Sequence, residues 1–146
     1  MIEVRFARKS EIEWINSKYD EVEFVHSIFD KEVIAIAELN DQRIGVGRLV
    51  TIDETNLELG GMYVFEDFRG QGVAKKIVEF LLRCSKSKQN IYCIPFQHLA
   101  SFYNAFGFIQ CVDFDHLPKE ILTKYLWCKD KYTTPTALLV LKQQDN

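Results

Sequence analysis

The chain has 146 residues, of which 47% are hydrophobic and 11 are Phe. This length is typical of one domain, residues 1–146, and its apolar content can fill a substantial core. The net charge of −3 excludes a general electrostatic attraction to nucleic acid, and it is compatible with a cationic acceptor. The apolar runs are too short for a membrane span.

The four cysteines are widely spaced without a C-x-x-C pair, and the three histidines do not group with them. We therefore expect reduced core cysteines and no metal site. The N-terminus carries charges among its first apolar residues, unlike a signal peptide. A reducing cytoplasm is the expected location.

The first third of the chain predicts a strand, a helix and a strand pair. Apolar and charged residues alternate over residues 2–6, which favours a strand. Ser10 is predicted to cap the following helix, with Glu13 as its capping-box partner. The acidic stretch 19–30 fits a short helix or a loop. Paired strands are expected at Val33–Leu39 and Arg43–Ile52, with a turn at Asn40-Asp41.

The remainder alternates strands and helices. The expected strands are Leu57–Val64, Asn90–Ile94, Phe108–Val112 and Thr136–Leu141. The expected helices are Gln71 to about Lys86, Leu99–Phe106 with Gly107 as a left-handed cap, and Leu117–Cys128 with Pro118 in its first turn. This order predicts an α/β or α+β domain with a central mixed sheet covered by helices.

A glycine-bearing turn joins the strand Leu57–Val64 to the helix that follows. Its residues are Arg69, Gly70, Gln71, Gly72, Val73 and Ala74. The first N–H groups of a helix lack intrahelical acceptors, and the helix dipole favours negative charge there. Glycine has no Cβ, so a phosphate can approach the backbone closely. The turn therefore predicts a phosphate or pyrophosphate ligand.

Three phosphate sites and an ordinary connection compete for this turn. A P-loop needs Lys followed by Ser or Thr after its last glycine, but Val73-Ala74 stands there. A dinucleotide fingerprint needs a third glycine, where this chain has Lys75, and a later acidic residue, where the next strand ends in Ile94-Pro95. The third candidate is a coenzyme A pyrophosphate site, which a family resemblance implies. The two glycines alone would also suit a strand-to-helix connection without a ligand.

A second segment, Ala100–Phe108, reads ASFYNAFGF. The turn and this segment resemble the Q/R-x-x-G-x-G/A and A-x-x-(F/Y)Y-x-x-x-GF motifs of the GCN5-related N-acetyltransferase (GNAT) family, in the same order and at the expected separation. The resemblance is sharpest over Val33–Cys111. It implies a central mixed, mostly antiparallel sheet of about seven strands flanked by helices, with a splayed strand pair for acetyl-CoA. The helix at Leu117–Cys128 departs from the plain hairpin that is common in the family.

The resemblance implies a set of contacts to acetyl-CoA. The glycine turn would hold the pyrophosphate, and Gln97 stands where relatives often have a cofactor-contacting asparagine. Ala105 stands where many relatives carry a lysine, so one phosphate contact is missing. The pantetheine arm would pair with the strand residues Met62, Tyr63 and Val64, whose N–H groups could also stabilise an oxyanion. Gly60-Gly61 suits a bulge, and Pro95 suits the end of ladder pairing.

Two residues match catalytic positions of the family. Glu58 matches a glutamate often taken as the base, and we expect it to act directly or through one water. The alternative is a solvated or salt-bridged strand glutamate. Tyr103 matches the tyrosine that faces the sulfur, where it also contacts the cofactor and can protonate the departing thiolate. The alternative is a core tyrosine whose hydroxyl is satisfied by backbone.

The leading hypothesis is an acetyl-CoA-dependent N-acetyltransferase. Its acceptor would be a primary amine of a small molecule or amino acid, attacking directly in a ternary complex. The expected partners are acetyl-CoA as co-substrate and an amine, without metal, nucleic acid or membrane, and a homodimer is left open. The alternatives are a protein or peptide N-acetyltransferase and a non-catalytic coenzyme A-binding sensor module.

Overall fold

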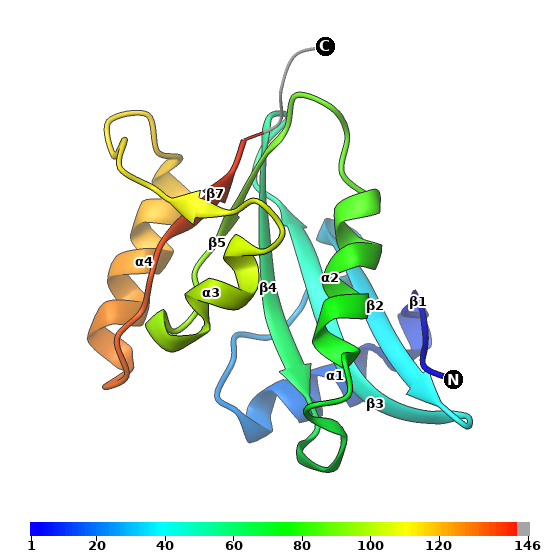
Figure 1. Ribbon diagram of the computed structural model, residues 1–146. Coiled ribbons are helices and arrows are strands. Elements are labelled where there is room, and N and C mark those ends of the chain that lie inside the picture. The colour runs from blue at the N-terminus through cyan, green and yellow to red at the C-terminus, as the bar shows by residue number, and fades with distance from the viewer. Residues whose placement is uncertain (143–146) are drawn as a thin grey trace. The chain divides into compact units, whose positions relative to one another are not determined.

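A computed structural model describes residues 1–142 of the chain. Seven strands in this part of the chain form one open sheet with the order β1-β2-β3-β4-β5-β7-β6 (Figure 1). The β4–β5 pair is parallel, and the pairs β1–β2, β2–β3, β5–β7 and β6–β7 are antiparallel. This mixed sheet with flanking helices confirms the predicted fold class.

The elements follow the predicted order, with shifted ends. The strands are β1 (Glu3–Phe6), β2 (Glu32–Leu39), β3 (Gln42–Thr51), β4 (Asn56–Val64), β5 (Asn90–Cys93), β6 (Ile109–Gln110) and β7 (Leu139–Leu141). The α-helices are α1 (Ile12–Glu21), α2 (Val73–Arg83), α3 (Ala100–Asn104) and α4 (Lys119–Lys131). Short 3-10 turns are η1 (Lys9–Glu11), η2 (Phe29–Lys31), η3 (Glu66–Phe68) and η4 (Gln97–Leu99).

The chain folds as two compact units that divide β4 between them. Unit 1 comprises Met1–Val50 and Gly61–Ser85, and unit 2 comprises Thr51–Gly60 and the described residues from Lys86 onward. Each unit therefore has its own part of the sheet and its own helices.

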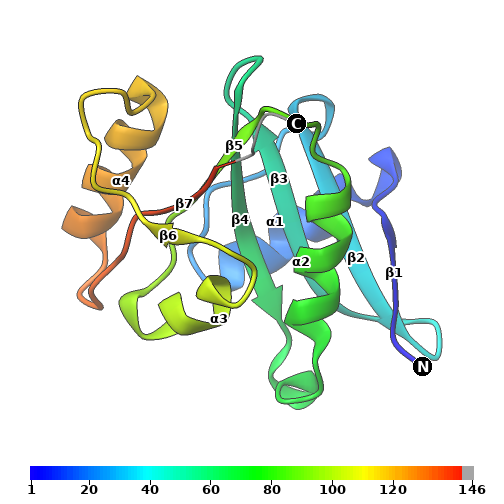
Figure 2. The same cartoon turned by 45° about the horizontal axis from the view of Figure 1, so that its top comes forward.

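In unit 1, one face of β2 and β3 is built from small residues. Across the ladder, Ala35 lies opposite Gly47 and Ala37 lies opposite Gly45. A Cβ placed on Gly47 would lie 2.6 Å from Ile77 Cγ2 and 2.6 Å from Met62 Sδ. The small face thus lets α2 lie close against the strands, as Figure 2 shows.

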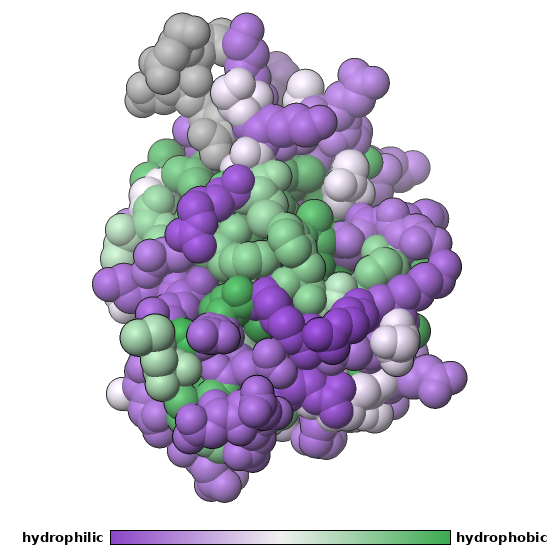
Figure 3. Space-filling view, turned by 90° about the vertical axis from the view of Figure 1, so that its right-hand side faces the viewer, coloured by the Kyte–Doolittle hydropathy of each residue, from purple (hydrophilic) through white to green (hydrophobic). Residues whose placement is uncertain are grey.

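The opposite face of the same strands carries the large residues. Side chains alternate along a strand, so Ile34 and Ile36 point away from the alanines. They form a core cluster with residues of α1 and β3, namely Ile15, Tyr19 and Val46. Figure 3 looks at the side of unit 1 that carries α2 and β1, where hydrophilic side chains surround an apolar area.

The start of α1 differs from the prediction. Ser10 does not cap the helix, because the turn η1 intervenes and α1 begins at Ile12. The Glu11 carboxylate accepts the Arg8 N–H at 2.9 Å, and Arg5 binds both of its oxygens at 2.8 and 3.0 Å. A carboxylate fixed by an arginine therefore takes the place of the predicted serine cap.

In unit 2, β5 and β7 separate two layers of side chains. Tyr92 and Val140, which pair across the ladder, join a core cluster with Ile121 of α4. Cys93 lies on the other face, where it contacts Tyr103 of α3. The helices α3 and α4 therefore cover opposite faces of this part of the sheet, as in Figures 1 and 2.

The last strands are shorter than predicted. β6 spans only Ile109–Gln110, and β7 begins at Leu139, although Thr136 makes an isolated bridge to Phe96. Gly107 has φ +100°, which confirms its predicted left-handed conformation. Among residues 1–142, no helix combines the length and hydropathy that a membrane span requires.

Candidate functional site

The glycine turn of unit 1 lies at the start of α2. Gly70 and Gly72 have φ +77° and +81°, a region that L residues with a Cβ rarely adopt. A Cβ on either residue would meet no protein atom within 4 Å, so among the neighbouring protein groups it is the backbone conformation that requires glycine here. The two glycines bend the chain so that α2 can begin at Val73.

The turn presents unpartnered backbone donors. Within residues 1–142, the N–H groups from Gly70 to Lys75 have no hydrogen-bond acceptor, and the first N–H to find one is that of Lys76, at 3.2 Å from Gly72 O. Successive free N–H groups at a helix start form a concave site for an anion. Arg69 lies beside them, with its Nε donating to Val64 O at 3.0 Å. These groups fit a pyrophosphate.

The strand that precedes the turn bends at Gly61. This residue has φ +59°, and a Cβ on it would lie 2.5 Å from Tyr19 Oη and 2.7 Å from Arg48 Nε. Tyr19 donates its hydroxyl to Gly61 O at 2.8 Å. Burial raises the pKa of the Tyr19 phenol, so it remains a protonated donor at neutral pH. The positive φ fits the bulge predicted at Gly60-Gly61.

A buried charge pair supports this bend. Arg48 and Glu32 have side chains only 5% and 7% exposed, with Arg48 Nη1 3.8 Å from Glu32 Oε1. Arg48 Nη1 also donates to Ser27 Oγ at 2.6 Å, and its guanidinium lies 4.6 Å from the Tyr19 ring centroid. Arg48 was not predicted as a functional residue, although a charged side chain in an apolar strand is a local sign of a special role.

The predicted pantetheine residues differ in what they contact. Met62 directs its sulfur toward Gly47 on the α2 side. Tyr63 points elsewhere, because its hydroxyl donates to Glu21 Oε1 at 3.0 Å and its ring lies 5.0 Å from that of Phe65. Their binding role, and that of Val64, stays a prediction.

Tyr103, on α3 in unit 2, is a buried tyrosine. Its ring meets Phe102 and Phe108 edge-on, with centroids 4.9 and 6.0 Å away, and Cys93 is its neighbour on β5. Burial raises the pKa of the Tyr103 phenol well above its usual range, and the neighbouring Cys93 raises it further. The hydroxyl is therefore protonated at neutral pH and available as a donor.

Glu58, on β4 in unit 2, is a buried carboxylate that forms an ion pair. Its side chain is 5% exposed, and Lys124 Nζ of α4 lies 2.6 Å from its Oε2. Of the two alternatives left open by the sequence, this geometry matches the salt-bridged glutamate, and it also places a primary amine within proton-transfer distance of the predicted base. Lys124 was not among the predicted site residues.

The predicted base and acid lie on opposite faces of the β4–β5 ladder. Glu58 pairs with Tyr92, whose face is covered by α4, and Leu59 pairs with Cys93, which contacts Tyr103. The parallel register covers Asn56–Leu59 and Asn90–Cys93. Beyond it, Pro95 O accepts the Ala137 N–H at 2.8 Å, so that segment pairs away from β4.

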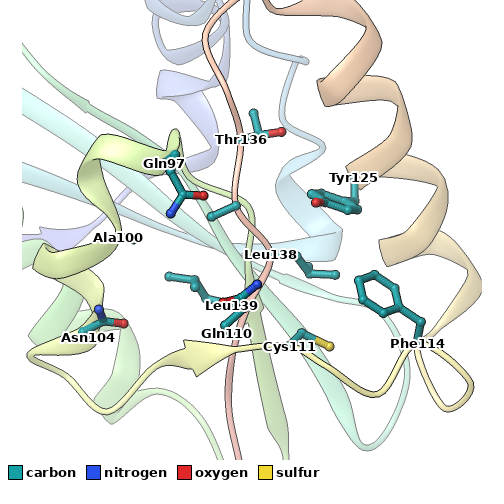
Figure 4. Close-up of a pocket in the computed structure, with 11 residues that line it drawn as sticks. Gln97, Ala100, Asn104, Gln110, Cys111, Phe114, Tyr125, Thr136, Leu138 and Leu139 are labelled. Atoms are coloured by element: carbon teal, nitrogen blue, oxygen red, sulfur yellow. The ribbon is translucent and has the colours of Figure 1, made fainter.

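Gln97 lies on η4, at a cavity of about 200 Å³ within unit 2 (Figure 4). The cavity is lined by side-chain amides of Gln97, Asn104 and Gln110 and by the rings of Phe114 and Tyr125. Thr136 Oγ1 also lines it and has no hydrogen-bond partner within the described residues. The predicted contact of Gln97 with the cofactor stays a prediction.

The cysteines of the chain form no disulfide within the described residues. All four cysteines are free, and Cys93, Cys111 and Cys128 are buried. Within residues 1–142, no group of three His, Cys, Asp or Glu side chains could hold a metal ion.

Solved structures share this fold. One is N-acetylglutamate synthase from Neisseria gonorrhoeae, complexed with coenzyme A and N-acetyl-glutamate, which is 15% identical with a TM-score of 0.74. The match covers 99% of this chain, but this chain spans only 36% of that one. Rv2747 from Mycobacterium tuberculosis, in complex with CoA, is 18% identical with a TM-score of 0.75 over 97% of this chain and 99% of that one. Arabidopsis thaliana Naa50, in complex with the bisubstrate analogue CoA-Ac-MVNAL, is 12% identical, with a TM-score of 0.69. The match covers 95% of this chain and 97% of that one.

These identities establish the fold alone, and no curated protein matches the chain. A family model described as the acetyltransferase (GNAT) domain matches residues 30–110, which include both the glycine turn and the Tyr103 segment. Because this match covers more than half of the 146 residues, the chain belongs to the GNAT family of acetyltransferases.

Proposed function

We propose that this protein is an N-acetyltransferase that transfers the acetyl group of acetyl-CoA to a primary amine by direct attack in a ternary complex. The observation that carries the proposal is the contact between Glu58 and Lys124. A buried carboxylate at the position of the family base already holds a primary amine at 2.6 Å. The acceptor amine would occupy an equivalent place.

Acetyl-CoA would be held by the start of α2. The free N–H groups from Gly70 to Lys75 would bind its pyrophosphate, and the helix dipole favours the negative charge. Arg69, Gln71, Val73 and Ala74 belong to this proposed contact with the two glycines. The chemistry of the donors, and not a bound ligand, supports this assignment.

The reaction would then use Glu58 and Tyr103 in separate roles. An alkyl ammonium has a pKa of about 10.4 in water, so the acceptor arrives mostly protonated. Glu58, directly or through one water, would first take a proton from the ammonium, because only the neutral amine has a lone pair with which to attack the thioester carbon. The C–N bond then forms and the C–S bond breaks. Tyr103 would give its proton to the departing thiolate, and the second proton, released by the nitrogen as the amide forms, would restore the phenol directly or through solvent.

The Tyr103 assignment has a structural requirement. It is buried beside Cys93, so its hydroxyl must be directed toward the sulfur of the leaving group when the cofactor is bound. A phenol of raised pKa is a weak acid but a good hydrogen-bond donor, which fits a role in which proton transfer follows the build-up of charge on sulfur. A backbone N–H of residues 62–64 would stabilise the oxyanion, a contribution typically of about 3 kcal/mol.

Thiol release from acetyl-CoA, measured over a panel of amines, amino acids and peptides, tests the proposal. Acceleration by an amine supports the transferase, whereas binding of acetyl-CoA without turnover of any acceptor would leave the sensor alternative. The peptide arm separates the second candidate, a peptide N-acetyltransferase, which the likeness to Naa50 keeps open.

The base role has its own kinetic test. Glu58→Gln should depress kcat/KM most at low pH, where the acceptor is most completely protonated and a base helps most. An unchanged pH–rate profile would remove Glu58 from the mechanism and favour a water chain.

A further inference from the structure

Lys124 is an unusual residue on α4. The other lysines of this helix are exposed, and they are Lys119, Lys129 and Lys131. Lys124 instead shares the inward face with the buried residues Ile121 and Cys128, three positions before it and four after it, and its side chain is 30% exposed. Lysine is rarely placed on a buried face unless it is paired. Its partner is Glu58, 66 positions away in sequence.

The ion pair places a constraint on any acceptor, if the function proposed above is right. The amine must reach the Glu58 carboxylate, and Lys124 Nζ already takes that place at 2.6 Å. Lys124 must therefore give up its contact. Within residues 1–142, Glu58 is the one carboxylate that forms an ion pair with Lys124. Once displaced, Lys124 could pair with Glu120, four residues before it on α4, only by turning out to the surface, because Glu120 is exposed.

The charge of the acceptor decides how well this displacement is tolerated. A simple amine brings a second cation to a single buried carboxylate, and like charges at close range repel. An α-amino acid brings its own carboxylate, joined to the same carbon as its amine. Its two groups are complementary to the separated Glu58 and Lys124, so each charge keeps a partner.

We propose that the acceptor is a free α-amino acid, whose amine binds Glu58 and whose carboxylate binds Lys124. Lys124 has the reach for this exchange, because its flexible four-carbon stem ends in a point charge with three donors. Its partial exposure lets the ammonium turn away from Glu58 without moving α4. The N-terminus of a peptide has no free α-carboxylate and would leave Lys124 without a partner beside Glu58, so the pair also selects against peptides.

The test compares acceptors that differ only in the carboxylate. For the wild type, kcat/KM is measured for the common L-α-amino acids, for their primary amides and for short peptides with the same first residue. The best amino acid should exceed its amide by at least tenfold. Lys124→Met should remove this preference, mainly by raising the KM of the amino acid, whereas Lys124→Arg should keep much of it.

Lys119→Met is the matched control, because Lys119 is exposed on the same helix and forms no ion pair among the described residues. It should leave the preference unchanged. Turnover of amides or peptides as fast as amino acids, or a preference that survives Lys124→Met, would overturn this inference while leaving the transferase intact. Failure with every amine despite acetyl-CoA binding would overturn the proposed function itself, and this inference with it.

Discussion

The Glu58–Lys124 ion pair can be tested without any substrate, by a double-mutant cycle in the free energy of unfolding. The variants are Glu58→Gln, Lys124→Met and the two combined. Removing one partner of a fully buried pair costs about 3–5 kcal/mol, whereas an exposed pair contributes about 0.2–1 kcal/mol. Glu58 is 5% exposed and Lys124 is 30% exposed, so this pair lies between the two limits.

We therefore expect Lys124→Met to lower the free energy of unfolding by about 2 kcal/mol, since it leaves a buried carboxylate without its counter-charge. For a chain of this size, that corresponds to a fall in Tm of about 6 °C. In the double variant no charge is left, so the coupling energy should be about 1–2 kcal/mol.

Urea unfolding followed by circular dichroism measures all four proteins, with Lys119→Met as a control expected to stay within about 0.5 kcal/mol of the wild type. If the effects of the two single variants add to within about 0.5 kcal/mol, the side chains are not coupled. That result would refute the ion pair and the reasoning built on it.

Three further predictions follow from other parts of the structure. Gly47→Ala should lower the free energy of unfolding in urea by about 2 kcal/mol, because its Cβ would lie 2.6 Å from Ile77. Gly45→Ala, whose Cβ would have nearest contacts of 3.3 Å, should lower it by less than about 1 kcal/mol. The reverse order would contradict the close approach of α2. The Arg5 guanidinium holds the pKa of Glu11 at about 2. Above pH 5, Glu11→Gln should therefore lower the free energy of unfolding by about 2 kcal/mol, and this difference from the wild type should vanish as the pH falls from about 4.5 to 2. A stability difference that does not depend on pH would refute this. Tyr103→Phe should lower kcat at least tenfold while calorimetry shows nearly unchanged acetyl-CoA binding, and wild-type turnover would exclude the acid role.

Local signals in the sequence were sufficient for most of the fold. Asn40-Asp41 was predicted as a turn, and both residues have the positive φ values, 51° and 65°, that a tight hairpin turn requires. Gly107, Gly70 and Gly72 likewise adopt the left-handed conformation that glycine tolerates best. These features depend on a few neighbouring residues, so a short segment contains the information.

Long-range partners could not be predicted in this way. Glu58 appeared in the sequence as a strand glutamate between two leucines, with no sign of which cation would meet it. Lys124 is on a different element, and only the position of α4 brings the two together. Its spacing from Ile121 and Cys128 placed it on the apolar face of a helix, a signal that could have marked it.

The ends of elements were also decided by tertiary contacts. Ser10 was wrong as a cap because Arg5, on β1, orients Glu11 to accept the free N–H of Arg8. β6 proved shorter than its apolar pattern because its ladder with β7 covers only Ile109 and Gln110. Local propensity locates such elements well and their boundaries poorly.

The central claim is that this protein forms an N-acetyl amide from acetyl-CoA and a primary amine. Thiol release alone does not prove it, because hydrolysis of the thioester also releases thiol. The most direct measurement is therefore mass spectrometry of the acceptor after incubation with the protein and isotope-labelled acetyl-CoA. We predict labelled acetyl amide in amounts matching the released thiol. Labelled free acetate, or acetyl-CoA that is bound but unchanged with every amine, would contradict the account.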